Sequence, residues 1–257
     1  DTAGVLARDD GGKAIVDVWG TIAGDYDKGK PLVMKSPSPE ESFADRVRFA
    51  FAAAGIDVGT VDVVHDAAPI GATTSIAVHE SKPLAEVLQT SLATSNAFDH
   101  EMFALAATSF AHHGAPVSLG DAANALNAFL SSRNARGSMV NASGIGNENL
   151  LRSRDIVALL DDARRHDSAL HALVDALATP GETGTLKTRL LDTAAEGTFR
   201  GKTGTGNKAA ALSGIVGEVT FSVLITDVAG REAVRAALDA IAIAMSTIAK
   251  QSEETTK

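Results

Sequence analysis

The chain has 257 residues, of which 45% are hydrophobic and 21% are charged, as in ordinary globular proteins. This composition excludes a disordered, collagen-like or coiled-coil protein and fits one large domain, alone or with a small appendage. The net charge of −9 argues against binding to nucleic acid or to anionic lipid. The absence of cysteine excludes disulfides, thiolate catalysis and cysteine-based metal centres.

The longest stretch without Asp, Glu, Lys or Arg, Met102 to Gly120, contains two histidines and a proline. A membrane span needs about 20 predominantly apolar residues, so no transmembrane segment is expected. Because the sequence begins with Asp1 and not Met, we expect a processed chain or a fragment.

The first third of the chain predicts short strands around one helix. Ser36-Pro-Ser-Pro followed by two glutamates is typical of a helix start, and the helix is expected from Glu41 to Ala54, with Gly55 ending it. Short apolar or alternating runs predict strands. These runs lie at residues 13–23, 32–36, 60–64 and 74–78.

The middle of the chain predicts helices, because its apolar residues recur at helical spacing. The first two are separated by Ala93-Thr94-Ser95-Asn96-Ala97, a polar corner that can present a side chain to a cleft. Residues 137–147 are rich in turn formers and predict a loop. The expected helices are 83–92, 98–111, 121–129, 153–160 and 168–177.

The end of the chain predicts an antiparallel meander of strands 198–203, 211–216 and 219–227, because the connections are short. A final helix follows, whose apolar stripe is expected to pack on this sheet. The stripe consists of Val234, Leu238, Ile241, Met245 and Ile248. The sequence therefore predicts an α+β fold with an antiparallel sheet and packed helices.

The segment Gly201-Lys-Thr-Gly-Thr-Gly206 has three interpretations. A P-loop requires glycine where Glu196 stands, and a dinucleotide-binding loop requires a crossover helix for which too few residues follow. The third is a Lys-Thr-Gly motif on an edge strand, as in penicillin-recognising serine enzymes. There the strand edge can pair with a peptide, while the lysine and threonine face its carboxylate. The tripeptide alone is a weak signal, so its neighbours matter.

Several neighbouring blocks occur in a characteristic order. They are Ser81–Leu88 followed by Ser95-Asn96, Asn141–Ile145 followed by Asn149, Thr183–Arg189, Ala194–Gly197, Arg200–Thr205 and Ala211–Val216. Over roughly Val16 to Thr226 the chain resembles the D-alanyl-D-alanine carboxypeptidase/endopeptidase family, which comprises the class C low-molecular-mass penicillin-binding proteins (peptidase S13).

This resemblance implies a fold of the serine β-lactamase and penicillin-binding transpeptidase type. It implies a serine DD-peptidase that acts on peptidoglycan stem peptides through an acyl-enzyme, with β-lactams trapped at the same serine. No metal and no organic cofactor is expected, and the location would be periplasmic or extracytoplasmic at the cell envelope. Ser95 and Lys202 would be catalytic. The residues expected to bind substrate are Asn96, Ser143, Thr203, Gly204 and Thr205.

The first departure from the family concerns the nucleophile, which the family carries in a Ser-x-x-Lys motif near the mature N-terminus. No serine here has lysine three residues later; Ser246 has Lys250 four residues later, on the final helix. The chain thus resembles the C-terminal part of the family, and an N-terminal fragment carrying Ser-x-x-Lys is a candidate partner. The expected domains are an accessory or N-terminal segment, 1–35, a transpeptidase-like domain, 36–250, and a polar tail expected to fray, 251–257.

The second departure is Ala97, which stands where the family has an asparagine that bonds the substrate's peptide group. Shifting the motif by one residue restores the asparagine as Asn96 but puts Thr94 in place of the serine, and the spacing favours Ser95 as the motif serine. Both departures favour an alternative interpretation, in which the protein is a catalytically inactive pseudoenzyme that binds peptidoglycan or a partner. A third alternative, an unrelated binding or scaffold domain, predicts that Ser95, Ser143 and Lys202 do not converge. Asp99-His100-Glu101 is interpreted as charging the first turn of its helix.

Overall fold

The computed structural model divides into two compact units, residues 1–78 and 79–257. The residues that it describes are 4–10, 13–19, 36, 38–64, 74, 78–165, 170–228 and 230–255. The division falls after Val78, while the domain boundary expected at residues 35 and 36 stays a prediction.

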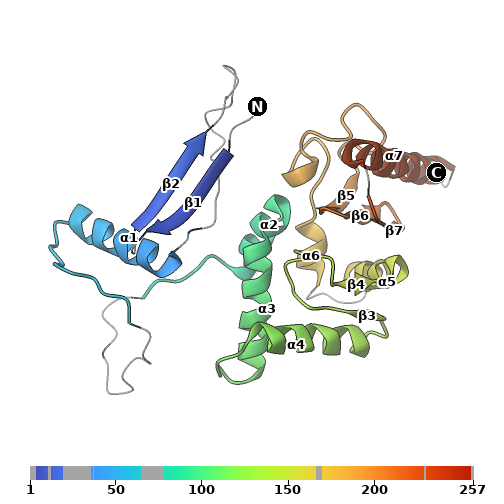
Figure 1. The fold of residues 1–257 in the computed structure, drawn as a ribbon. Coiled ribbons are helices and arrows are strands. Elements are labelled where there is room, and N and C mark those ends of the chain that lie inside the picture. The colour runs from blue at the N-terminus through green and yellow to red at the C-terminus, as the bar shows by residue number, and fades with distance from the viewer. Residues whose placement is uncertain are drawn as a thin grey trace. The chain divides into compact units, whose positions relative to one another are not determined.

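The described residues of the first unit form a hairpin and one helix (Figure 1). Strand β1 (Gly4–Asp10) pairs antiparallel with β2 (Lys13–Trp19), which places Val5 opposite Val18. Strand β2 confirms the described part of the strand predicted at 13–23. Helix α1 (Pro39–Ala53) confirms the helix predicted from Glu41 and begins two residues earlier, with proline in its first turn, where no backbone N–H is needed.

One predicted strand of this unit is wrong. Residues 60–64 belong to no helix or strand. An apolar run becomes a strand only when a neighbouring strand accepts its hydrogen bonds, and none of the described residues pairs with it. Most of the strands predicted at 32–36 and 74–78 lies outside the described residues.

The second unit begins with helices, which confirms the five helices predicted there. Two-residue strands β3 (Gly137–Ser138) and β4 (Leu150–Leu151) pair with each other and enclose the predicted loop. Figure 1 shows α2, α3 and α4 following one another away from the sheet. The helices are α2 (Leu84–Thr94), α3 (Ala97–Ala111), α4 (Leu119–Ser132), α5 (Ser153–Arg165) and α6 (His171–Asp175).

The sheet of this unit has the order β5-β6-β7 and is antiparallel throughout, which confirms the predicted meander. Its strands are β5 (Phe199–Thr205), β6 (Ala209–Val216) and β7 (Val219–Thr226). Alternate residues of β6 face different layers: Leu212 lies in the cluster with the final helix, whereas Ile215 lies in the cluster with Leu160 of α5. The sheet therefore lies between α7 (Arg231–Thr255) and the helices α5 and α6.

The final helix packs on the sheet as predicted, but two residues of its predicted stripe do not. Leu238 is 3% exposed and Ala242 is fully buried, whereas Ile241 is 37% and Ile248 is 53% exposed. A helix turns 100° per residue, so Ile241 and Ala242 lie on opposite sides of Leu238 around the helix, and the contact face lies on the side of Ala242. Small Ala242 and Ala249 fill the contact instead. The described part of the predicted tail continues α7 to Thr255.

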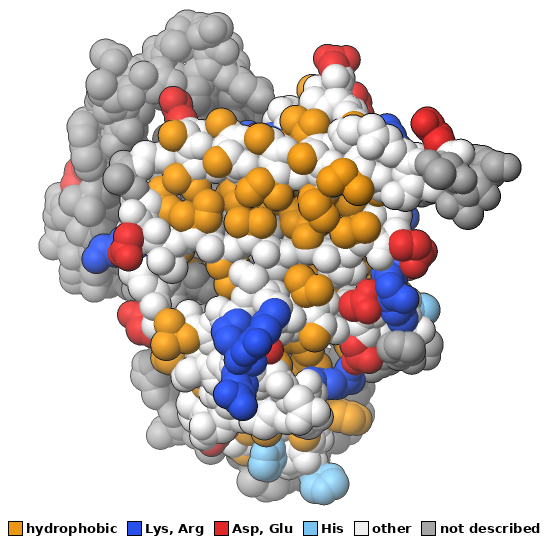
Figure 2. Space-filling model, turned by 90° about the vertical axis from the view of Figure 1, so that its right-hand side faces the viewer, with side chains coloured by type: hydrophobic (Ala, Val, Ile, Leu, Met, Phe, Trp, Pro, Cys, Tyr) orange, Lys and Arg blue, Asp and Glu red, His pale blue; other side chains and the backbone are white. Residues whose placement is uncertain are grey.

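The face that carries α7 and β7 shows a band of hydrophobic side chains (Figure 2). Exposed large hydrophobic residues of these two elements are Leu224 on β7 and Ile241 and Ile248 on α7. No helix in the described part of the chain has the length and apolar character needed to cross a membrane.

Candidate active site

The predicted corner between the first two helices of the second unit presents Ser95. Helix α2 ends at Thr94, and Ser95 takes the left-handed conformation, with φ 54° and ψ 47°. The Oδ1 atom of Asn96 then accepts hydrogen bonds from the backbone of Phe98 (3.1 Å) and Asp99 (3.4 Å), which caps α3. A left-handed serine costs about 1 kcal/mol or more, and the two helix ends hold it there. Ser95 is therefore fixed at a sharp turn, while the side-chain oxygen of Asn96 is used within the corner.

Lys202 of β5 reaches this corner from far along the sequence. Its Nζ atom donates to Ser95 Oγ and to the Thr203 carbonyl oxygen, both at 2.7 Å. Burial of the ammonium group lowers the pKa of Lys202 from its ordinary value. A lysine that releases its proton more easily, bonded to a serine hydroxyl, can pass a proton to and from that serine.

The loop between β3 and β4 brings Ser143 to the same place. The backbone N–H of Ser143 donates to the Glu101 carboxylate of α3 at 3.0 Å, and its Oγ donates to Asn141 Oδ1 at 3.1 Å. Burial by itself raises the pKa of Glu101. Hydrogen bonds from Ser143 and from the Ala142 backbone outweigh burial and hold that pKa below its ordinary value. Glu101 thus acts as an ionised anchor for the loop.

These elements enclose a cavity of about 570 Å³. Six of the seven predicted site residues line it, and Asn96 is the exception. Its wall also contains Ala97, His100 and apolar side chains of α5 and α6. The convergence of Ser95, Ser143 and Lys202 does not fit the alternative of an unrelated scaffold, which requires them to lie apart. The six residues are Ser95, Ser143, Lys202, Thr203, Gly204 and Thr205.

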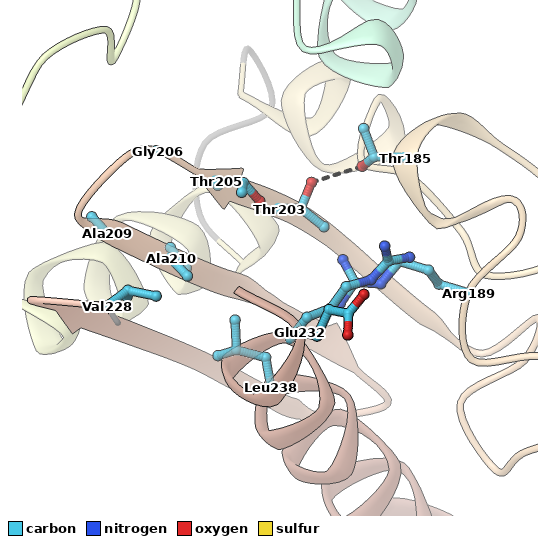
Figure 3. A pocket seen from close by; sticks show the side chains of 13 residues that line it. Thr185, Arg189, Thr203, Thr205, Gly206, Ala209, Ala210, Val228, Glu232 and Leu238 are labelled. Carbon is cyan, nitrogen blue, oxygen red and sulfur yellow. Dashed lines mark hydrogen bonds between the residues drawn. The ribbon is translucent and has the colours of Figure 1, made fainter. Parts of the chain in front are cut away.

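Thr203 also borders a second pocket of about 330 Å³ between β5 and the start of α7. Figure 3 shows its hydroxyl directed at Thr185, and the two Oγ1 atoms lie 2.8 Å apart. Thr185 belongs to the 3₁₀ turn Gly184–Leu186. Gly184 has φ +59°, and a Cβ there would lie 2.8 Å from the Ala93 carbonyl oxygen, so glycine lets this turn approach the end of α2.

The family model of the D-Ala-D-Ala carboxypeptidase 3 (S13) family matches residues 5–248. The chain belongs to this family. The S13 chain is also 32% identical over 231 residues to carboxypeptidase DacB of Mycolicibacterium smegmatis, an alignment that covers 85% of this chain and 49% of the relative. The S13 chain therefore spans about half the length of the curated relative.

Solved structures confirm the predicted fold class. A crystal structure of penicillin binding protein 4 (dacB) from Haemophilus influenzae has a TM-score of 0.73 and 19% identity, over 89% of this chain and 51% of that one. The same protein complexed with a β-lactam has a TM-score of 0.68 and 21% identity, over 88% and 53%. At this identity the likeness concerns the fold, which is the α+β fold of penicillin-binding proteins.

Sequence reasoning missed three polar residues of the S13 chain. Glu101 and His100 were interpreted as charges on the first turn of α3, but Glu101 bonds the Ser143 backbone and His100 lines the cavity. Thr185 lies in the block Thr183–Arg189, one of those on which the family resemblance rests, but the sequence predicted no role for it. The helical spacing of Ala97, His100 and Glu101 was a usable signal, because residues three or four apart share a helix face.

Proposed function

We propose that this chain forms the Lys-Thr-Gly side of the active site of a serine DD-peptidase that cleaves the D-Ala–D-Ala bond of peptidoglycan stem peptides. The observation that carries the proposal is the hydrogen bond from Lys202 Nζ to Ser95 Oγ, formed between β5 and the α2–α3 corner at the cavity. Membership of the S13 family and the shared fold of β-lactam-binding relatives support it. Such a substrate places the protein at the cell envelope, outside the cytoplasm.

The proposed reaction is acyl transfer. A serine Oγ attacks the carbonyl carbon of the penultimate D-Ala, its proton passes to the leaving amine, and free D-Ala departs. Water then attacks the ester, restores the serine hydroxyl and releases the shortened peptide. Ser95 and Lys202 relay the proton. Thr203 and Thr205 bind the terminal carboxylate, and Gly204 leaves room for the peptide beside β5.

The attacking serine is proposed to come from a Ser-x-x-Lys segment outside these 257 residues, since the chain itself has no such motif. The length of the relatives, about twice the part matched here, supports this assignment. Within the described residues, β7 pairs only with β6 and therefore has a free edge. That edge and the hydrophobic band of Figure 2 offer this segment a docking surface.

The test is intact-mass spectrometry after incubation with benzylpenicillin. The 257-residue chain is measured alone and co-expressed with a separate segment that carries Ser-x-x-Lys. We expect an adduct on the segment, none on this chain, and acylation about 10²-fold slower or more with Lys202→Met. Lys208→Met is the matched control, because Lys208 is exposed on the same hairpin. An adduct on this chain would refute the assignment of the nucleophile.

A pseudoenzyme that binds peptidoglycan without turnover is the second candidate. The observation that favours it is Ala97, a side chain without polar atoms in the wall of the cavity. No adduct on either chain, together with binding of a D-Ala-D-Ala peptide, is the result that this candidate predicts.

A further inference from the structure

His100 lies on the same face of α3 as Ala97, one turn further along. Residues three apart on a helix are neighbours, and both of these side chains line the cavity that contains Ser95 and Lys202. Ala97 offers this cavity a methyl group. Unlike that methyl group, the imidazole of His100 can form hydrogen bonds from this face of the helix.

The imidazole of His100 has unused hydrogen-bonding capacity. Its Nε2 atom is buried and has no hydrogen-bond partner among the described residues. Leaving such a group unpaired is unfavourable. Other buried side-chain atoms without a partner belong to Ser91, Arg164, Arg189 and Ser246, and none of these four residues lines this cavity. Among the described residues with such an unpaired atom, His100 is thus the one that lines this cavity.

The surroundings of His100 favour its neutral form. Burial of the ring lowers its pKa most, the Lys202 ammonium lowers it further, and the charges of Asp99 and Glu101 oppose this, with a net lowering. A neutral imidazole has one N–H donor and one lone-pair acceptor. A peptide group likewise offers one acceptor and one donor, so the two are matched.

We propose that His100 is a ligand-binding residue of this cavity and that its imidazole forms a hydrogen bond to a backbone peptide group of the bound stem peptide. The inference rests on the proposed function, because it takes the cavity to hold a peptide. Thr203 and Thr205 would bind the charged end of the peptide, and His100 would orient its main chain from the α3 side.

The test is an NMR titration of the 257-residue chain with the probe diacetyl-L-Lys-D-Ala-D-Ala. We expect the Hε1 signal of His100 to shift on binding, and His100→Ala to weaken binding about fivefold to tenfold, as loss of one hydrogen bond predicts. His100→Gln keeps a donor and an acceptor and should bind within about twofold of the wild type. Ala97→Asn added to His100→Ala should recover binding, because its amide enters the same face of the cavity.

The matched control is His112→Ala, since His112 is exposed at the other end of α3. Unchanged affinity in His100→Ala, together with weakened affinity in Thr203→Val, would overturn the inference and leave the proposed function standing. An unshifted His100 signal in the bound wild type would overturn it as well, without reference to the folding of any variant. Absence of binding to the wild type would contradict the proposed function and the inference that rests on it.

Discussion

Glu101→Gln tests whether the loop that carries Ser143 is held by a charge. The carboxylate accepts the Ser143 backbone N–H at 3.0 Å, and its lowered pKa keeps it ionised at neutral pH. A hydrogen bond to a charged group contributes about 1.5–3 kcal/mol and a neutral one about 0.5–1.5 kcal/mol. Glutamine keeps an acceptor oxygen and removes the charge, so the variant should lose about 1 kcal/mol of unfolding free energy at pH 7.

The stabilisation by Glu101 should depend on pH. Because the pKa of Glu101 is lower in the folded chain, the unfolded chain binds the proton more readily. The stabilisation is complete above the ordinary carboxyl pKa and is lost as the pH falls through the lowered folded-state pKa. Urea denaturation between pH 7 and pH 3 should therefore show the difference between wild type and Glu101→Gln shrinking in acid.

The matched control is Glu148→Gln, on the same loop. Its carboxylate accepts from the backbone of its neighbour Asn147 at 2.8 Å and makes no contact with α3 in the described structure. Amide hydrogen exchange at Ser143 should speed up in Glu101→Gln and not in the control. Equal stability of wild type and Glu101→Gln at pH 7, or equal exchange at Ser143, would refute the idea of a charged anchor.

Three further predictions concern the core, one backbone turn and the cavity histidine. Phe199 is fully buried and stacks on Phe221 at 5.3 Å between ring centroids, so Phe199→Ala should lower the unfolding free energy by about 3–5 kcal/mol in urea; a loss under about 1 kcal/mol would contradict this. Gly184→Ala adds a Cβ against the Ala93 carbonyl at positive φ and should lower the melting temperature, whereas Gly230→Ala, with open space around it, should not. Because burial lowers the pKa of His100, the unfolding free energy of the wild type should fall as the pH drops from 6.5 through the folded-state pKa. In His100→Gln this fall should be absent. An equal fall in the variant would contradict the prediction.

The order of helices and strands in the second unit could be predicted because local signals and tertiary packing agree there. Helical spacing marked α2 to α5, and short connections between apolar runs marked the meander of β5, β6 and β7. In the first unit β1 was missed, although Gly11-Gly12 between two alternating runs is a hairpin signal. The strand predicted at 60–64 is wrong because a strand-like pattern does not form a strand when no neighbouring strand pairs with it.

Most of the residues predicted from motifs line one cavity, whereas contacts that depend on the direction of a side chain were missed. Nothing local distinguishes His100 from its charged neighbours on the first turn of α3. Only the approach of β5 makes its face of the helix the wall of a cavity. Asn96 shows the same limit, because its side-chain oxygen caps α3 in the folded corner.

By itself the sequence determined the α+β class, the polar corner at Ser95, the Lys-Thr-Gly strand and the family, because each depends on residue type and short spacing. Only the tertiary structure decided that Lys202 bonds Ser95, 107 positions away along the chain, that Glu101 anchors the Ser143 loop, and that the His100 nitrogen is buried without a partner among the described residues. Contacts between distant segments follow from how helices and strands pack in space, and burial sets the protonation of Lys202 and His100. Neither the contacts between distant segments nor the burial of a side chain can be deduced from the spacing of neighbouring residues.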